Sequence, residues 1–268
     1  MSFKLAFPNR SKRHGGDLIY ETADNWGLIE VVDHRQVRSL HFGNEVTQSS
    51  LNTQAPHRLC LEYTKAMTLP LLLHEDIKRI LVCGLGGGSL VNFYAHHCPD
   101  AQIDVLELRP NLIDIAQNYF SLPQDCRIQH FIGDAWDYFK PNKTENYDLI
   151  LIDLYDAKGM ADCMKRFGLM ARIHEYLNQG GMAAFNLWSE PSSLMKTNQY
   201  YLHQVFGEDL AQVSMEETTN MIALVAKGNL FVQPLERLKA KAQSIDKEHQ
   251  IGLTKLLRTL NQQNRHLF

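Results

Sequence analysis

Four acidic residues stand at or just beyond the ends of apolar runs in this 268-residue chain: Glu107, Asp134, Asp153 and Asp156. If those runs are parallel strands, their carboxyl ends meet at one edge of a sheet and the acids gather there. A carboxylate at such an edge accepts hydrogen bonds from ribose hydroxyls or from an adenine amino group. Paired loop carboxylates can bind or deprotonate a substrate amine. The pattern therefore predicts an adenosine site with an acidic neighbour.

Each acid also has a plainer interpretation. Glu107 is compatible with an ordinary surface residue at a strand end, and an NAD enzyme would place an acid there as well. Asp134 is compatible with a role as a helix N-cap alone. Asp153 and Asp156 are compatible with simple turn chemistry that ends in Gly159. The four acids taken together are more specific than any one of them.

A glycine-rich turn precedes these acids, in the stretch RILVCGLGGGSL at 79–90. Gly84, Gly86 and Gly88 lack a Cβ atom, so the backbone can turn sharply and a ligand can approach it closely. In the dinucleotide pattern G-x-G-x-x-G, however, the third glycine position is occupied by Ser89. The turn therefore predicts a nucleoside-binding loop, with tight packing of a strand against a helix as the plainer alternative.

From residue 79 onward, apolar runs alternate with segments of helical pattern. Continuous apolar runs are typical of strands that are buried on both faces. Their alternation with helices predicts an α/β fold with a Rossmann-like doubly wound sheet. The expected strands are 79–84, 102–108, 127–133, 147–154 and 181–188, and the expected helices are 88–98, 110–120, 134–140 and 163–178.

The flanking regions have different patterns. Short β-branched or alternating runs separated by turn residues fill 17–50, which predicts a small antiparallel β unit. We therefore expect an N-terminal tail and small β domain over 1–56, and a Rossmann-like nucleoside-binding domain over 57–231. Polar, amphipathic helices are expected over 232–268.

Composition excludes several classes of protein. The formal net charge of -3 and the pI near 6.4 argue against nucleic-acid binding driven by phosphate neutralisation. No apolar run approaches the ~18–20 residues that span a bilayer, and no signal-peptide pattern is present. The five cysteines are scattered without a C-x-x-C pair, which predicts reduced thiols, a cytoplasmic location and no metal site. The neighbours His96 and His97 point in different directions on a helix, so one metal ion would not easily use both.

Six short motifs, read in order, resemble the spermidine synthase family, the polyamine aminopropyltransferases. They are VTQSS, LEYTKAM, GLGGGS, ELRP, GDA and DLYDAKG, and the likeness spans roughly 17–230. The resemblance implies the fold of class I S-adenosylmethionine methyltransferases behind a small N-terminal β domain, and assembly as a homodimer or homotetramer. It implies transfer of an aminopropyl group from decarboxylated S-adenosylmethionine to a small-molecule amine acceptor, without a metal.

The resemblance also implies which residues bind the donor. Glu107 would hold the ribose, while Asp134 and Ala135 would contact the adenine. Gln48 would approach the nucleoside from the N-terminal β domain. These roles come from the family's motifs, matched position by position onto this chain.

For the acceptor, the resemblance implies that Asp153 and Asp156 match the paired acids of the family's D-x-x-D loop. Asp153 would orient the attacking amine and help deprotonate it, with Tyr63 nearby. The reaction is a displacement at the carbon next to a sulfonium. The protein's contribution is then mostly placement, together with a neutral amine in line with the C–S bond.

The chain departs from the family pattern at three points. Ser89 stands where the family loop has an aspartate that pairs with the donor's amino group. A serine at a helix N-terminus tolerates a carboxylate better than an aspartate does, which favours ordinary S-adenosylmethionine. The segment after Tyr63 lacks the family's acid and has Lys65, and the loop after Asp156 reads Ala157–Lys158 without the family's usual proline.

These departures leave alternatives open. A methyltransferase on the same fold is the main one, and a non-catalytic protein that binds nucleosides or polyamines is another. An NAD oxidoreductase is disfavoured by Ser89 at the third glycine position and by Asp134.

Overall fold

The computed structural model describes residues 11–140, 146–188, 192–215, 219–228 and 234–267. Within them, the first five strands form an antiparallel sheet in the order β1-β2-β3-β4-β5, called here the N-terminal sheet. This sheet confirms the small antiparallel β unit predicted from the short runs. Its strands are β1 (Lys12–Arg13), β2 (Gly16–Asp24), β3 (Gly27–His34), β4 (Val37–His41) and β5 (Thr47–Asn52).

A second, larger sheet, called here the central sheet, has the order β13-β14-β12-β9-β6-β7-β8 in the described residues. The pairs among β12, β9, β6, β7 and β8 are parallel, whereas β14 pairs antiparallel with both β12 and β13. The strand order reverses at β6, which confirms the doubly wound sheet. The strands are β6 (Arg79–Cys83), β7 (Gln102–Glu107), β8 (Ile128–Ile132), β9 (Tyr147–Ile152), β12 (Leu177–Trp188), β13 (Leu210–Ser214) and β14 (Asn220–Ala226).

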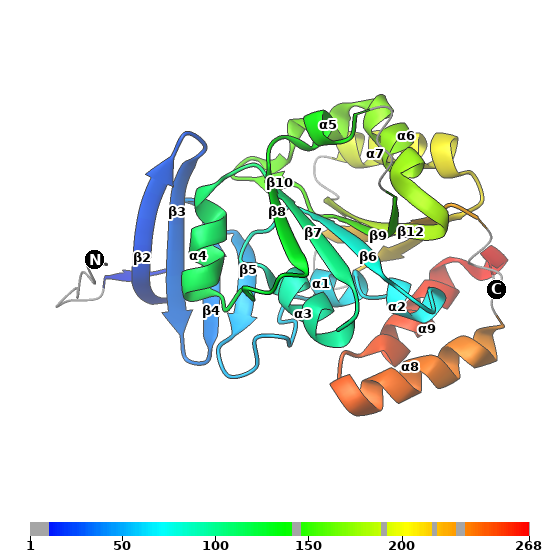
Figure 1. The fold of residues 1–268 in the computed structure, drawn as a ribbon, viewed down its shortest axis with the longest axis horizontal. Helices are drawn as coiled ribbons and strands as arrows, with labels where there is room; N and C mark the ends of the chain where they lie inside the picture. The colour runs from blue at the N-terminus through cyan, green and yellow to red at the C-terminus, as the bar shows by residue number, and fades with distance from the viewer. Residues whose placement is uncertain (1–10, 141–145, 189–191, 216–218, 229–233, 268) are drawn as a thin grey trace.

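Helices cover both faces of the central sheet (Figure 1). On one face lie α5 (Ala135–Tyr138), α6 (Phe167–Tyr176) and α7 (Ser192–Phe206), at the top of the view. On the other lie α1 (Glu62–Ala66), α2 (Pro70–Leu73), α3 (Ser89–His97), α8 (Leu235–His249) and α9 (Leu253–Gln263). The remaining elements are α4 (Asn111–Tyr119), the 3₁₀ turns η1 (Asp162–Lys165) and η2 (Arg265–Leu267), and the short pair β10 (Tyr155–Asp156) and β11 (Gly159–Met160).

The side chains on the two faces of β6 pack into two separate hydrophobic cores. Ile80 and Val82 point into the core that α3, α8 and α9 cover, whereas Leu81 and Cys83 point into the core beneath α6 and α7. This alternation is the two-residue period of a strand. Because both faces are apolar, the strand reads as a continuous hydrophobic run, as its sequence predicted.

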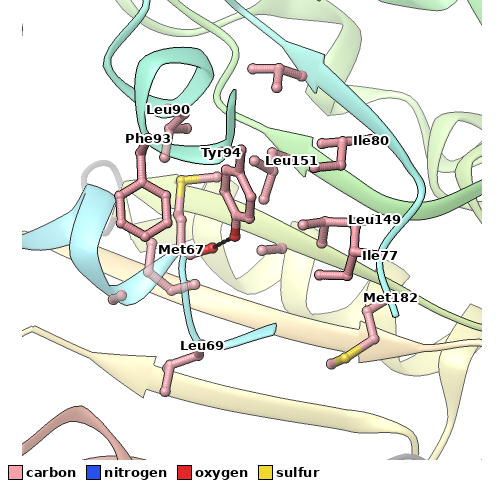
Figure 2. Packing of buried hydrophobic residues seen from close by; sticks show 14 of the residues in the cluster. Met67, Leu69, Ile77, Ile80, Leu90, Phe93, Tyr94, Leu149, Leu151 and Met182 are labelled. Carbon is pink, nitrogen blue, oxygen red and sulfur yellow. Dashed lines mark hydrogen bonds between the residues drawn. The ribbon is translucent and has the colours of Figure 1, made fainter. Parts of the chain in front are cut away.

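The segment that carries Tyr63 is held against α3 by a buried hydrogen bond. The Tyr94 hydroxyl on α3 donates to the carbonyl oxygen of Met67 at 2.9 Å, and both residues are fully buried. Figure 2 shows this bond among the side chains of Leu149 and Leu151 from β9. A buried polar group keeps its hydrogen bond because losing the partner is costly. The bond therefore fixes where the end of α1 lies relative to α3.

Arg109 joins the N-terminal sheet to the end of β7. Its guanidinium donates to both carboxylate oxygens of Asp24, at 2.8 and 3.0 Å, and to the carbonyl oxygen of Gly27 at 2.9 Å. It also lies over the ring of Phe42, 4.5 Å from the centroid. Paired, planar contacts of this kind are geometrically specific. The β2–β3 hairpin is thus held beside the carboxyl edge of the central sheet. The three-part division at 56 and 231 remains a prediction.

Four histidines from three distant segments pack their rings into a cluster at the C-terminal end of α3. The rings of His57 and His96 stack at 4.1 Å, and those of His97 and His249 meet edge to face at 4.1 Å. Burial, and then the positive charge that its neighbours would carry, lower the pKa of His97 to about 3. The same causes lower the pKa of His57.

We expect this cluster to make the protein less stable in mild acid. Below pH ~6.5, His97 binds a proton in the unfolded chain but stays neutral in the folded protein. The free energy of unfolding therefore falls as the pH falls, by up to about 1.4 kcal/mol per pH unit for this group. Urea unfolding at pH 7.5, 6.5 and 5.5 measures the slope. His97→Phe should flatten it, while His203→Asn at an exposed position should not. An unchanged slope in His97→Phe would contradict the assignment.

Candidate functional site

A pocket of about 260 Å³ opens where the carboxyl ends of β6, β7 and β9 face the N-terminal sheet. Ligands of open α/β sheets bind at this edge, beside the point where the strand order reverses. The structure brings most of the predicted site residues together here. Those that line the pocket are Gln48, Tyr63, Gly84, Gly86, Ser89, Glu107, Asp153 and Asp156.

Gly84 is required by the close approach of two strand ends. Its φ is +92°, and a Cβ atom there would lie 2.1 Å from the carbonyl oxygen of Asp153. The ends of β6 and β9 can therefore lie this close together only because residue 84 has no side chain. Gly88, by contrast, is the N-cap of α3 and faces Leu122 rather than the pocket.

Gly84→Ala should destabilise the protein by roughly 2–4 kcal/mol, because it combines an unfavourable backbone conformation with a collision against backbone. Gly180→Ala is the matched control, since Gly180 has a φ of +81° but nothing within 4 Å of the added atom. The control should lose only about 1–2 kcal/mol. Chemical denaturation compares the two, and equal losses would show that the collision is relieved.

Glu107 ends β7 with both carboxylate oxygens already held. Oε2 accepts from the backbone N–H of Leu85 at 2.8 Å, and Oε1 from that of Arg109 at 2.8 Å. Burial raises the pKa of Glu107, while these bonds act in the opposite direction. A carboxylate has about four acceptor positions. Two bonds to the backbone therefore orient the group and leave acceptor capacity for ligand hydroxyls.

Asp153 follows β9, and its carboxylate is held by two side-chain hydrogen bonds. Its Oδ1 accepts from Nδ2 of Asn186 at 2.8 Å, and its Oδ2 accepts from the hydroxyl of Tyr63 at 3.2 Å. Burial raises the pKa of Asp153 to about 6, against these two bonds. A carboxylate with a pKa near neutrality suits general base chemistry.

Asp156 lies in the tight turn between β10 and β11. Its Oδ1 accepts from the backbone N–H of Lys158 at 2.7 Å, so the turn chemistry proposed as its plainer role is present. The carbonyl oxygen of Ala157 accepts from Nδ2 of Asn44 at 2.9 Å, which ties the turn to the loop before β5. Turn geometry and a place in the pocket therefore coexist for Asp156.

Ser89 begins α3 and bonds across to the N-terminal sheet. Its hydroxyl lies 2.8 Å from that of Ser49 on β5, and both side chains are buried. The two hydroxyls hold the glycine-rich turn against β5, next to Gln48. This contact gives Ser89 a structural role in addition to its place in the pocket wall.

Asp134 and Ala135 lie outside the residues that line the pocket. Asp134 is the N-cap of α5, where its side chain accepts from the backbone N–H of Trp136 at 2.7 Å. Ala135 is buried in the core beneath α6. N-capping, the plainer interpretation of Asp134, is therefore present, and contact of either residue with adenine remains a prediction.

Several pocket residues were not anticipated from the sequence. Asn186 is a buried amide inside the apolar run of β12, and a polar residue in such a run is the signal that could have found it. Trp26 and Phe42 reach the pocket from the N-terminal sheet, and Trp188 and Asn220 reach it from β12 and β14, the strands beyond β9 in the central sheet. Their sequence contexts carry no comparable signal.

Within the described ranges, no group of three or more His, Cys, Asp or Glu side chains is arranged to hold a metal ion. In the same residues, no helix combines the length and apolar character needed to cross a bilayer. All five cysteines are free thiols.

The spermine/spermidine synthase domain, as a family model, matches residues 61–221. This chain belongs to that family. The match contains the glycine-rich turn, Glu107 and Asp153, whereas Gln48 precedes it. Family membership confirms the resemblance read from the ordered motifs.

The relatives of this spermine/spermidine synthase family member include aminopropyltransferases and methyltransferases. The polyamine aminopropyltransferase of Chromobacterium violaceum is 27% identical over 237 residues, which cover 88% of this chain and 90% of the relative. The eEF1A lysine and N-terminal methyltransferase of Xenopus laevis is 30% identical over 207 residues, covering 71% of this chain but only 30% of that protein.

Solved structures agree on the fold. A probable spermidine synthase from Corynebacterium glutamicum aligns with a TM-score of 0.71 at 17% identity, covering 83% of this chain and 86% of that one. Human methyltransferase-like protein 13, in complex with SAH, aligns with a TM-score of 0.62 at 24% identity, covering 74% and 93%. At these identities the likeness concerns the fold, and it confirms the predicted fold class.

Proposed function

We propose that this family member transfers an aminopropyl group from decarboxylated S-adenosylmethionine to a small amine, a step of polyamine biosynthesis. The observation that carries the proposal is Asp153, a carboxylate with a pKa of about 6 that shares one pocket with Glu107. The first is suited to accept a proton and the second to bind a ribose. Relatives named polyamine aminopropyltransferase, aligned over nearly their whole length, support the same activity.

The donor would bind on the side of the pocket formed by β6 and β7. Glu107 accepts hydrogen bonds from the two ribose hydroxyls with the lone pairs that the backbone leaves available. The turn at Gly84 and Gly86, both in the pocket wall, would let the nucleoside approach the backbone closely, whereas Gly88 caps α3 away from the pocket. Gln48 reaches it from β5, and Asp134 with Ala135 would meet the adenine.

The acceptor would bind between Asp153 and Asp156, with Tyr63 beside the first. The amine nitrogen forms a bond to the propyl carbon next to the sulfonium, and the C–S bond breaks with its electrons going to sulfur. Methylthioadenosine leaves, and the proton of the amine passes to Asp153. Holding the nitrogen in line with the C–S bond supplies most of the rate enhancement.

Methyl transfer from S-adenosylmethionine is the second candidate, and Ser89 is the observation that favours it. Ser89 carries no charge where an aspartate would pair with the amino group of the decarboxylated donor, and it begins a helix that favours an anion. Lys158, exposed at the pocket rim, suits an acceptor with an anionic group. A lysine and N-terminal methyltransferase among the relatives supports this candidate too.

Titration calorimetry with S-adenosylmethionine, its decarboxylated form and methylthioadenosine separates these functions, followed by product analysis with a diamine. Preference for the decarboxylated nucleoside together with an alkylated diamine supports aminopropyl transfer. Preference for the carboxylated form overturns the proposal in favour of methyl transfer. Tight binding of methylthioadenosine without turnover on any amine indicates a binding protein.

The resemblance to the family further suggests a homodimer or homotetramer in the cytoplasm, which we keep as part of the proposal. Light scattering coupled to size exclusion measures the mass of the assembly. A monomer of 30.8 kDa at micromolar concentration would contradict this part of the proposal.

A further inference from the structure

A line of hydrogen bonds reaches Asp153, at the end of β9, from the neighbouring strands β12 and β14 of the central sheet. Nδ2 of Asn220 on β14 donates to Oδ1 of Asn186 on β12 at 2.9 Å, and Nδ2 of Asn186 donates to Oδ1 of Asp153 at 2.8 Å. Asn186 pairs with Ile222 in the antiparallel ladder, so Asn220 is its diagonal neighbour on the same face. Neither amide was part of the predicted site.

The direction of this line is set by the carboxylate. An ionised carboxylate only accepts hydrogen bonds, so Asn186 must turn its NH₂ group toward Asp153. Its carbonyl oxygen then faces Asn220, which must in turn present its own NH₂ group. Asn186 is only 3% exposed, so water cannot easily replace either partner. A half-satisfied buried amide is costly, and the two amides are therefore held in one orientation.

The two oxygens of Asp153 are consequently not equivalent. Protonation of Oδ1 would place an O–H donor against the NH₂ group of Asn186. If the Asn186 amide rotated to accept from that O–H, its NH₂ group would face the NH₂ group of Asn220. Oδ2 meets the hydroxyl of Tyr63, which is both donor and acceptor and needs only to rotate its hydrogen. A proton is therefore accommodated on Oδ2 and resisted on Oδ1.

We propose that Asn186 and Asn220 are positioning residues that hold Oδ1 of Asp153 as a permanent acceptor and leave Oδ2 to receive the substrate proton. The inference rests on the proposed function, because it assigns the proton-accepting oxygen in that reaction. As the amine N–H bond breaks, an O–H bond forms on Oδ2, and Tyr63 turns from donor to acceptor.

Other groups around Asp153 also bear on its titration. Tyr63 on α1 donates to Asp153, and burial together with the charge of Asp153 raises the pKa of Tyr63 and of Tyr155 on β10. The Tyr155 hydroxyl donates to the backbone carbonyl of Asn186 at 3.1 Å and so supports the same strand. The charged residues Glu107, Asp156 and Lys158 line the same pocket, and all of these groups stay unchanged in the variants below.

The test measures the pKa of Asp153 by carbon-13 NMR of labelled aspartate, in wild type, Asn186→Leu, Asn220→Asp and the double variant. Asn186→Leu removes the donor with little change of shape, so the pKa should rise by about one unit or more. Asn220→Asp replaces the distal donor with a carboxylate, which draws the NH₂ group of Asn186 away from Asp153, so the pKa of Asp153 should also rise. In the double variant the second change should add little, because the line is already broken.

Additive shifts would instead mean that the carboxylate introduced by Asn220→Asp acts only by its charge through space. That result would overturn the proposed positioning by the line of hydrogen bonds. Shifts below about 0.3 unit in both single variants would overturn it as well. If Asn186→Leu fails to fold, half-buried Asn220 decides alone, with Asn220→Leu as its uncharged control and a smaller expected shift.

Turnover separates this inference from the proposed function. Wild type that converts no decarboxylated S-adenosylmethionine with any diamine refutes the function, while the NMR titration still reports on the positioning by the line of hydrogen bonds. With an active enzyme, the acidic limb of kcat should move upward in both single variants by the same amount as the pKa, and the affinity for methylthioadenosine should change less than about twofold. Unmoved acidic limbs with normal folding would overturn the positioning role.

Discussion

Asp153→Asn should lower kcat for aminopropyl transfer by about 10²- to 10⁴-fold, the range expected for loss of a general base. Asparagine keeps the shape and an acceptor oxygen for Asn186 or Tyr63, but it cannot take a proton from the amine. Nucleoside binding should hardly change, because Glu107 and the glycine-rich turn are untouched. Initial rates with saturating donor and calorimetry with methylthioadenosine measure the two quantities.

The pH dependence gives the same experiment a second readout. With a pKa of about 6, Asp153 is mostly ionised at pH 7 and becomes protonated as the pH falls through 6, so kcat should decline there. The residual activity of Asp153→Asn should lack this acidic limb. Asp114→Asn, at an exposed position on α4, is the matched control and should behave as wild type. Normal turnover in Asp153→Asn would show that the acceptor site has been placed wrongly.

Glu107→Gln should weaken the binding of all three nucleosides alike, by about 10²- to 10³-fold. Hydrogen bonds to a charged group contribute roughly 1.5–3 kcal/mol each, and the ribose offers two hydroxyls. The glutamine NH₂ group would also meet the backbone N–H of Leu85 or of Arg109, so one donor is left without an acceptor. Calorimetry with each nucleoside measures the loss.

Because Glu107 also supports the backbone, unfolding must be measured beside binding. Glu107→Gln should lower the midpoint of thermal unfolding, yet remain folded at 25 °C, where the binding is measured. Glu175→Gln on α6 is exposed and serves as the control for both quantities. Wild-type affinity in a folded Glu107→Gln protein would mean that the ribose binds elsewhere.

Much of the site was predictable from local sequence. Continuous apolar runs and glycine-rich turns specify strands and their ends, because burial on both faces and left-handed backbone leave direct marks on residue type. The alternation of strands with helices then implies one parallel sheet and a common carboxyl edge. Glu107 and Asp153 follow from that reasoning, since each ends a strand of the sheet.

The tertiary structure decided which side chains from distant segments meet. Asn186 and Asn220 come together through the register of β12 and β14, and His57, His97 and His249 through the docking of α3 and α8. The sequence alone determined the strands, their order in the chain and the acids at their ends, since these depend on neighbours within a few residues. It left open the partners of each acid, because contacts across more than 30 positions depend on how whole elements pack.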